Sequence, residues 1–182
     1  MNEYYKNDGG QFKDKLKETE TRDEAEMLHR AAAYCSIAER CIYDVRKKIA
    51  SAGLSPESEE RIIARLIEEK FIDEARFCRC FVSDKSRFNE WGRIKMSGAL
   101  RRKGIAQSLI DEALSRIDED DYRRILTELL IRKKRTVRSV SDTDLFVKLC
   151  RFAVNKGYEQ SLVVQCVKKL CQGGRFDDDD LE

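Results

Sequence analysis

Three glycines at nearly regular intervals constrain the fold of this chain more than any other feature of the sequence. Gly53, Gly104 and Gly157 lie 51 and 53 positions apart, and each ends a stretch of helical apolar periodicity. A glycine in this place is typical of the left-handed residue that follows a helix end. Apolar residues recur at four matched offsets from these glycines. Four positions before them stand Ile49, Leu100 and Ala153, and eight positions before them stand Val45, Met96 and Leu149. Ten positions after them stand Ile63, Leu114 and Val167, and thirteen positions after them stand Leu66, Ile117 and Leu170. The matched offsets predict a tandem repeat of about 50 residues.

Local start signals divide the chain into helices. Ser55-Pro56 places a capping serine before a proline at the first helical position, and Asp73 and Ser141 are further helix caps. Residues 118–121 place carboxylates at a helix start, where the helix dipole favours them. The sequence from Ser36 to Glu39 matches a capping box, which predicts that one helix ends near Tyr34 and the next begins at Ile37. We expect helices over about 23–34, 37–51, 56–70, 74–88, 93–103, 106–116, 119–135, 142–156 and 159–171.

These observations predict an all-α protein with three tandem three-helix repeats in an elongated, curved array. The charged fraction of 38% exceeds that of ordinary domains, which favours much exposed helical surface. A unit of about 50 residues buries little surface by itself, so we expect neighbouring repeats to support one another. The expected segments are a disordered tail over 1–21, repeats over 22–72, 73–117 and 118–172, and an acidic tail over 173–182.

The net charge of +2 hides a concentration of basic residues near the end of the chain. Residues 122–174 carry twelve basic and four acidic side chains, a net charge of +8. Such asymmetry indicates a surface for a polyanion or an acidic partner, although basic residues near helix ends also complement the helix dipole. For the basic residues 46–48, we favour the interaction with the helix dipole over binding to a partner. The candidate binding residues are Arg93, Lys95, Arg101, Arg102, Lys103, Arg132, Lys133, Lys134, Arg135 and Arg138.

No sequence motif for catalysis or for a cofactor is present. The chain lacks the glycine-rich nucleotide loops, the zinc-protease motif and the nucleophile elbow. Its single histidine, His29, has no partner motif, and its seven cysteines are scattered without a zinc or disulfide pattern. We therefore expect no enzyme activity, no cofactor and no metal. The sequence also lacks a long apolar run and a signal peptide, so we expect a cytoplasmic protein that does not enter a membrane.

The middle of the chain carries a specific pattern of residues. They are Phe71-Ile72-Asp73-Glu74-Ala75-Arg76-Phe77, Phe81-Val82, Lys85-Ser86-Arg87, Trp91-Gly92, Lys95-Met96, Leu100 and Lys103-Gly104-Ile105. This pattern resembles the central repeat of RecX proteins. The likeness is dense only between residues 71 and 105, and it is weaker around Ser36–Glu39 and Lys156–Tyr158. Where the family commonly has a Gly-Tyr-Gly-Pro turn, this chain has Glu90-Trp91-Gly92-Arg93.

The resemblance implies a negative regulator of the RecA recombinase. RecX-like proteins lie in the groove of the filament that RecA forms on single-stranded DNA, and they inhibit its ATPase, co-protease and strand-exchange activities. The implied partners are the RecA filament and single-stranded DNA, contacted directly or through the filament, and we expect a monomer. The basic residues named above would supply the electrostatic part of binding.

Two other functions remain open on the sequence alone. Three-helix units with short glycine turns also occur in helix-turn-helix DNA-binding regulators, although no unit here shows a clear recognition helix. A scaffold repeat protein that binds another acidic partner is the second alternative. Binding to a defined duplex sequence would favour the first, and partner binding independent of RecA would favour the second.

Overall fold

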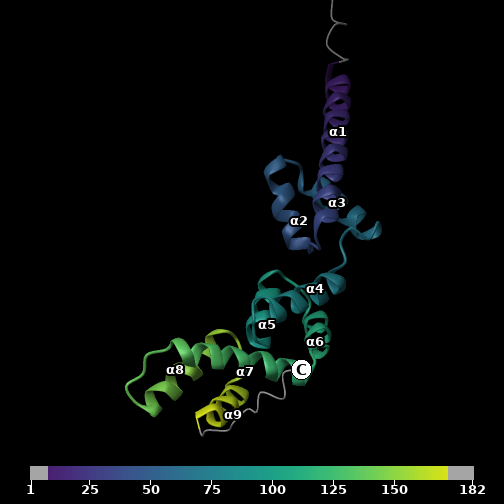
Figure 1. Ribbon diagram of the computed structural model, residues 1–182. Helices are drawn as coiled ribbons and strands as arrows, with labels where there is room; N and C mark the ends of the chain where they lie inside the picture. Colours follow the sequence, from purple (N-terminus) through teal and green to yellow (C-terminus); the bar gives the residue numbers. More distant parts are fainter. Residues whose placement is uncertain (1–7, 172–182) are drawn as a thin grey trace, which may run out of the picture. The chain divides into compact units, whose positions relative to one another are not determined.

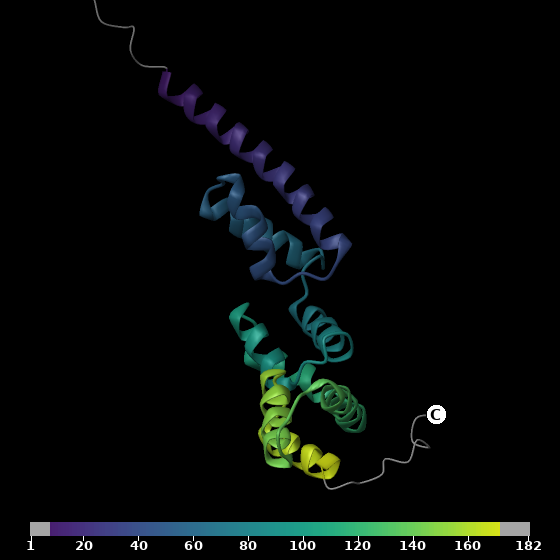
Figure 2. The same cartoon turned by 60° about the vertical axis from the view of Figure 1, so that its left-hand side comes forward.

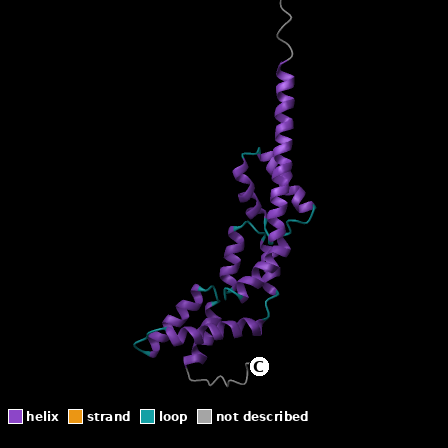
Figure 3. Ribbon diagram, turned by 45° about the horizontal axis from the view of Figure 1, so that its top comes forward, coloured by secondary structure: helices purple, strands orange, loops and turns teal. Residues whose placement is uncertain are grey.

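The all-helical fold is confirmed over the part of the chain that the structure describes. A computed structural model describes residues 8–171, with side chains from residue 23 onward, and this range contains nine α-helices, one short 3₁₀ helix and no strand (Figure 3). Residues 1–7 and the acidic tail predicted for 173–182 lie outside the described residues. The chain divides into two compact units, Met1–Phe77 and Cys78–Glu182, each of which is described by itself.

The first unit is a small helical cluster built on one long helix. Helices α2 (Ile42–Ile49) and α3 (Pro56–Glu68) pack against the C-terminal part of α1 (Asp8–Ile37), and the 3₁₀ helix η1 (Ala50–Ala52) follows α2 (Figures 1 and 2). Apolar side chains from all three α-helices close the core. They are Met27, Ala31, Cys35, Val45, Ile49, Ile62, Ile63 and Leu66, joined by Ile72.

Two predictions for this unit are wrong. Helix α1 begins at Asp8, so residues 8–21 are helical where the sequence suggested disorder. The capping box also does not form, because Ser36 lies inside α1 and its hydroxyl donates to the carbonyl of Ala32 at 2.9 Å. The carboxylate of Glu39 instead accepts from Nε of Arg76 at 2.6 Å. A tertiary ion pair has therefore replaced the local cap, and the next helix starts only at Ile42.

The second unit contains most of the remaining helices. Helix α4 (Glu74–Arg87) begins in the first unit and continues into the second, and it is followed by α5 to α9 (Figure 1). The ranges are α5 (Arg93–Arg102), α6 (Gln107–Ser115), α7 (Glu119–Thr136), α8 (Asp142–Asn155) and α9 (Gln160–Cys171). Every predicted helix start in this unit lies within one residue of the observed start.

The predicted caps are made by the expected side chains. Ser55 accepts from the amide of Ser58 at 3.3 Å, and Asp73 accepts from that of Arg76 at 2.9 Å. Ser141 caps α8 through the amide of Asp144 at 3.1 Å, and Asp118, one of the carboxylates at a predicted helix start, caps α7 through that of Asp121 at 2.9 Å. Each oxygen satisfies one of the amides that a helix start leaves without a partner.

The three glycines adopt the left-handed conformation that their spacing predicted. Their φ angles are +68° for Gly53, +76° for Gly104 and +92° for Gly157. After the last two, the amides of Ile105 and Tyr158 donate back across the helix end to Leu100 and Ala153, both at 3.3 Å, and both side chains are buried. The six apolar positions four and eight before the glycines are fully buried. Ile94, assigned to the same apolar pattern as Met96 and Leu100, is instead 60% exposed.

No helix in the described range is long and apolar enough to span a membrane.

Candidate interaction surface

The ten predicted binding residues all belong to the second unit and lie on two helices and the segment after α7. Two are at the start of α5, three are at its end, and five are at the end of α7 and just beyond. Six of the side chains are exposed: Arg101, Arg102, Arg132, Lys134, Arg135 and Arg138. The other four are half-buried: Arg93, Lys95, Lys103 and Lys133.

Arg93 is engaged inside the unit rather than free on its surface. Its guanidinium pairs with Glu119 at 2.6 Å and with Glu159 at 3.7 Å, and it lies 4.2 Å above the ring centre of Tyr122. The side chain is only 21% exposed. Two carboxylates already balance this charge, so Arg93 is less available to an external anion than the sequence suggested.

Tyr122 joins the start of α5 to the start of α9. Its hydroxyl accepts from the backbone amide of Arg93 at 2.9 Å and donates to Glu159 at 2.9 Å. Burial raises the pKa of Tyr122 far above its usual range, and the neighbouring Glu159 carboxylate adds to the shift. The ring also contacts that of Tyr158, with the ring centres 5.0 Å apart and the planes tilted by 36°. Tyr122 was not among the site residues singled out from the sequence, because no local pattern indicates these polar bonds.

The turn between α4 and α5 brings together charges that are far apart in the sequence. A carboxylate oxygen of Glu90 accepts from the guanidinium of Arg132 on α7, and Nζ of Lys156 lies 4.0 Å from the other oxygen. Nζ of Lys156 also donates to the carbonyl of Asn89 at 3.2 Å. Arg132 was a predicted binding residue, whereas Glu90 and Lys156 were not singled out. The turn therefore carries one anion between two cations.

The same turn carries an aromatic group surrounded by lysines. Nζ of Lys95 lies 4.5 Å from the ring centre of Trp91, and Nζ of Lys85 lies 5.4 Å from it. Trp91 packs edge-on against Phe81 with ring centres 6.4 Å apart, and it is half-buried. The adjoining Phe88 is 81% exposed. The turn thus offers an open aromatic side chain beside several cations.

The remaining predicted cations differ in how far other groups of the protein already bind or balance their charge. Lys133 lies 5.0 Å from the ring centre of Phe152, and Nζ of Lys134 donates to the carbonyl of Leu170 at 3.1 Å. Nε of Arg101 donates to the neutral side chain of Gln107 at 2.8 Å, so its charge is not balanced there. The exposed Arg102 and Arg135 have no ion-pair partner among the described residues. Arg138 is also exposed, with no ion-pair partner among the described residues. These four arginines are the predicted site residues with the most available charge.

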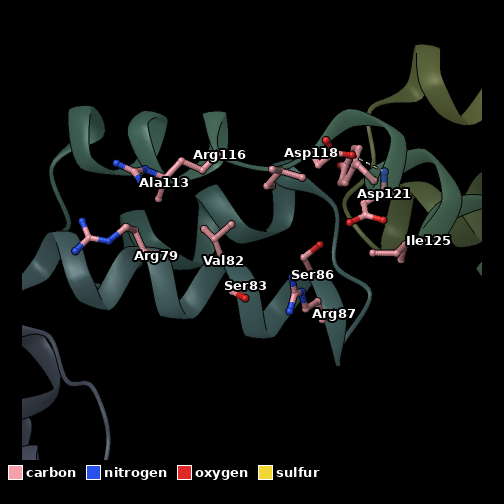
Figure 4. A pocket seen from close by; sticks show the side chains of 12 residues that line it. Arg79, Val82, Ser83, Ser86, Arg87, Ala113, Arg116, Asp118, Asp121 and Ile125 are labelled. Carbon is pink, nitrogen blue, oxygen red and sulfur yellow. Dashed lines mark hydrogen bonds between the residues drawn. The ribbon is translucent and has the colours of Figure 1, made fainter.

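A small cavity lies between α4, the end of α6 and the start of α7 (Figure 4). Its volume is about 180 Å³, and Asp118 and Asp121 lie at one end of it. Three arginines border it, Arg79 and Arg87 from α4 and Arg116 just after α6. They were not among the predicted site residues, and they extend the cationic surface of this unit beyond α5 and α7. Within residues 23–171, no group of three or more His, Cys, Asp or Glu side chains is placed to hold a metal ion.

Comparison with known proteins agrees with the resemblance noted in the sequence. Residues 73–114 match the family model described as RecX, second three-helix domain. A regulatory protein RecX from Clostridium tetani is 34% identical over 134 residues, which are 72% of this chain and 60% of the relative. The chain belongs to the RecX family.

Other RecX proteins match over different shares of their length. The one from Lactobacillus johnsonii is 27% identical over 157 residues, covering 86% of this chain and 57% of the relative. The one from Prosthecochloris aestuarii is 28% identical over 148 residues, covering 81% and 95%. The chain spans only about three fifths of the length of the relatives from C. tetani and L. johnsonii.

Solved RecX structures share the fold. A crystal structure of regulatory protein RecX has a TM-score of 0.77 at 22% identity, covering 93% of this chain and 81% of that one. RecX from Lactobacillus salivarius has a TM-score of 0.71 at 18% identity, covering 82% and 97%.

The turn between α4 and α5 also has an unusual backbone. The φ of Glu90 is +54°, which lies in the left-handed region that favours glycine. Three residues later, Arg93 uses its backbone amide to bond Tyr122. A proline has no amide hydrogen, so it could not make this bond.

Proposed function

We propose that this chain is a negative regulator of RecA that binds in the groove of the RecA–single-stranded-DNA filament. In this role it inhibits the ATPase, co-protease and strand-exchange activities of the filament, as a monomer and without chemistry of its own. The observation that carries the proposal is the RecX second-domain match over residues 73–114, together with 34% identity to a regulatory protein RecX.

The surface of the second unit supports a polyanionic partner. Arg101, Arg102 and Arg135 are exposed without a balancing carboxylate among the described residues, and Arg79 and Arg87 add charge on α4. Cations of this kind bind nucleic-acid phosphates by releasing condensed counterions, and they also attract acidic protein surfaces. A filament of RecA on single-stranded DNA presents both.

The proposed binding is multivalent. Repeats over 22–72, 73–117 and 118–172 contact different RecA protomers, so each contact raises the effective concentration of the next. Weak individual contacts then add to a stable complex. A complex of this kind blocks filament extension or promotes disassembly, and one bound copy affects several protomers.

The direct test is the ATPase rate of RecA from the same organism on single-stranded DNA, with this protein titrated in below one copy per RecA. The proposal predicts loss of rate at such substoichiometric amounts. An unchanged rate at excess protein, with circular dichroism showing the helical fold, contradicts the proposal. Selection of a duplex consensus site by the same protein would then favour the helix-turn-helix alternative.

A further inference from the structure

Glu90 holds an uncommon backbone conformation for its residue type. Its φ of +54° is one of two positive values at non-glycine residues in the described range, the other being Lys70. A side chain in this region crowds the following carbonyl, and such positions persist only where the surroundings hold them. The α4–α5 turn would form more easily with glycine at this position. Contacts made by the Glu90 side chain offset part of this cost.

Those contacts are two cations from separate elements. Arg132 comes from α7 and Lys156 from the end of α8, and both meet the Glu90 carboxylate. The Arg132 side chain is 52% exposed, whereas those of Glu90 and Lys156 are 26% and 29% exposed. The cluster is open to solvent on one side, and the carboxylate occupies the position between the cations that an external anion would need.

We propose that Arg132 and Lys156 form a binding site for a phosphodiester group of single-stranded nucleic acid, and that Glu90 is an internal competitor for that site. A phosphate oxygen has the charge and acceptor chemistry of the carboxylate oxygen that it replaces, and arginine and lysine are the side chains that bind phosphate best. By occupying the site, Glu90 lowers the affinity of this chain for the nucleic-acid backbone. The inference deepens the proposed function and rests on it for the presence of single-stranded DNA at the filament.

The surroundings favour nucleic acid over a free phosphate ion. Phe88 lies two residues from Glu90 and is 81% exposed, with the exposed Arg87 beside it in sequence. Exposed aromatic rings next to cations bind single strands by stacking on bases while the cations neutralise the backbone. A free phosphate ion uses only the cations, so it leaves the aromatic side chain without a role.

The test compares Glu90→Gln with the wild-type chain in the absence of RecA. Binding to a short fluorescein-labelled oligothymidylate is followed by fluorescence anisotropy over a series of salt concentrations. We expect Glu90→Gln to bind roughly 3- to 10-fold tighter at about 0.1 M salt, with a steeper slope of log affinity against log salt by about 0.7 for each phosphate gained.

Glu112→Gln is the matched control. It removes the same charge from an exposed glutamate that also pairs with an arginine, Arg116, at 3.0 Å. If both variants tighten binding equally, net charge alone explains the effect and the proposal is overturned. An unchanged affinity in Glu90→Gln also overturns it, as does the lack of oligothymidylate binding by both wild type and variant.

One further variant tests the backbone conformation of Glu90, and a double variant tests the assignment to Arg132. Glu90→Gly removes the charge and relieves the backbone conformation, and it should tighten binding as Glu90→Gln does. In an Arg132→Gln background, Glu90→Gln should give little gain, because one of the two cations that it releases is absent. A full gain in that background overturns the assignment to Arg132. Thermal unfolding of each variant checks that the fold is retained.

The source of the phosphate is tested by replacing chloride with inorganic phosphate at equal ionic strength. We expect Glu90→Gln to keep most of its advantage, because a polyanion with stacked bases outcompetes a single ion. Complete loss of the advantage in phosphate buffer assigns the site to the free ion and overturns the proposal. All these measurements omit RecA, so absence of ATPase inhibition rejects the proposed function without affecting this result.

Discussion

Gly92 and Gly157 are in direct backbone contact although they are far apart in the sequence. A Cβ atom added to Gly92 would lie 2.1 Å from the carbonyl carbon of Gly157, and one added to Gly157 would lie 2.2 Å from Cβ of Lys95. The amide of Gly92 donates to the carbonyl of Lys156 at 2.9 Å, and that of Ile94 donates to Gly157 at 3.0 Å. The start of α5 is thus joined to the α8–α9 turn, with no space for a side chain at either glycine.

Replacing Gly157 with alanine should destabilise the chain far more than the same change at Gly104. Both glycines have positive φ, so each variant suffers backbone strain of about 1–2 kcal/mol. Only at Gly157 does the added Cβ also collide with its neighbours, because nothing lies within 4 Å of the Gly104 position. Overpacking should add about 1–3 kcal/mol. Urea unfolding of both variants measures the difference, and equal losses would show that the contact is not tight in solution.

Replacing Tyr122 with phenylalanine should lower the free energy of unfolding by about 1–3 kcal/mol, because it removes the hydroxyl that accepts from the amide of Arg93 and donates to the Glu159 carboxylate. Tyr158→Phe is the control, since the two rings are in contact and equally buried but no hydrogen bond of the Tyr158 hydroxyl is found among the described residues. Urea unfolding should show a clear loss only for Tyr122→Phe. Similar losses in both would assign the effect to general burial of hydroxyl groups.

Alkaline pH should destabilise the second unit through these same tyrosines. Burial raises the pKa of both Tyr122 and Tyr158 in the folded chain, so in each case the folded state retains a proton that the unfolded state releases above about pH 10. The unfolded state then binds fewer protons, and stability falls as pH rises past about 10, by up to about 1.4 kcal/mol per pH unit for each tyrosine.

The measurement is urea unfolding between about pH 9 and 11, with tyrosinate absorbance recorded in parallel. Tyr122→Phe should show a shallower loss than the wild type, because one of the two coupled protons is gone. Ionisation of all tyrosines without loss of helical signal would contradict the raised pKa values.

Charge reversal at Arg102 and Arg135 should weaken binding to the RecA filament, with only a small loss of stability from the two negative charges placed at helix C-termini. Both side chains are exposed and lack ion-pair partners among the described residues, so their charge is available to an external anion. The double variant Arg102→Glu/Arg135→Glu should bind more weakly and show a flatter salt dependence. Lys47→Glu, an exposed change in the first unit, is a single-site control. Unchanged affinity and salt slope in the double variant would remove these two residues from the proposed interface.

The sequence was informative wherever a feature depends on neighbouring residues. The caps at Ser55, Asp73 and Ser141 and the left-handed glycines depend on a few adjacent positions, so their pattern was enough to predict them. Val163 and Val164 favour a strand by their β-branching, but the helix expected over 159–171, where Val167 and Leu170 keep the phase of the earlier repeats, is confirmed as α9.

Features that depend on distant partners were missed. Glu39 left the expected capping box because Arg76, 37 positions later, offers a stronger partner. Glu90 and Tyr122 gained their roles from Arg132 and from Glu159, which no local pattern connects to them. The start of α1 was missed for a different reason. Gly9-Gly10 suggested disorder, whereas the following stretch has no proline and many lysines and glutamates, which are good helix formers.

The three glycine turns differ in what surrounds them, and this bears on where the chain can grow. Gly53 and Gly104 face open space, with no atom within 4 Å of an added Cβ, whereas Gly157 is enclosed. Extra residues in an open turn cost little loop entropy and meet no neighbouring side chain at the glycine itself. Insertions and deletions should therefore occur mainly in the first two turns. The third turn should keep a constant length, because its backbone contacts the start of α5.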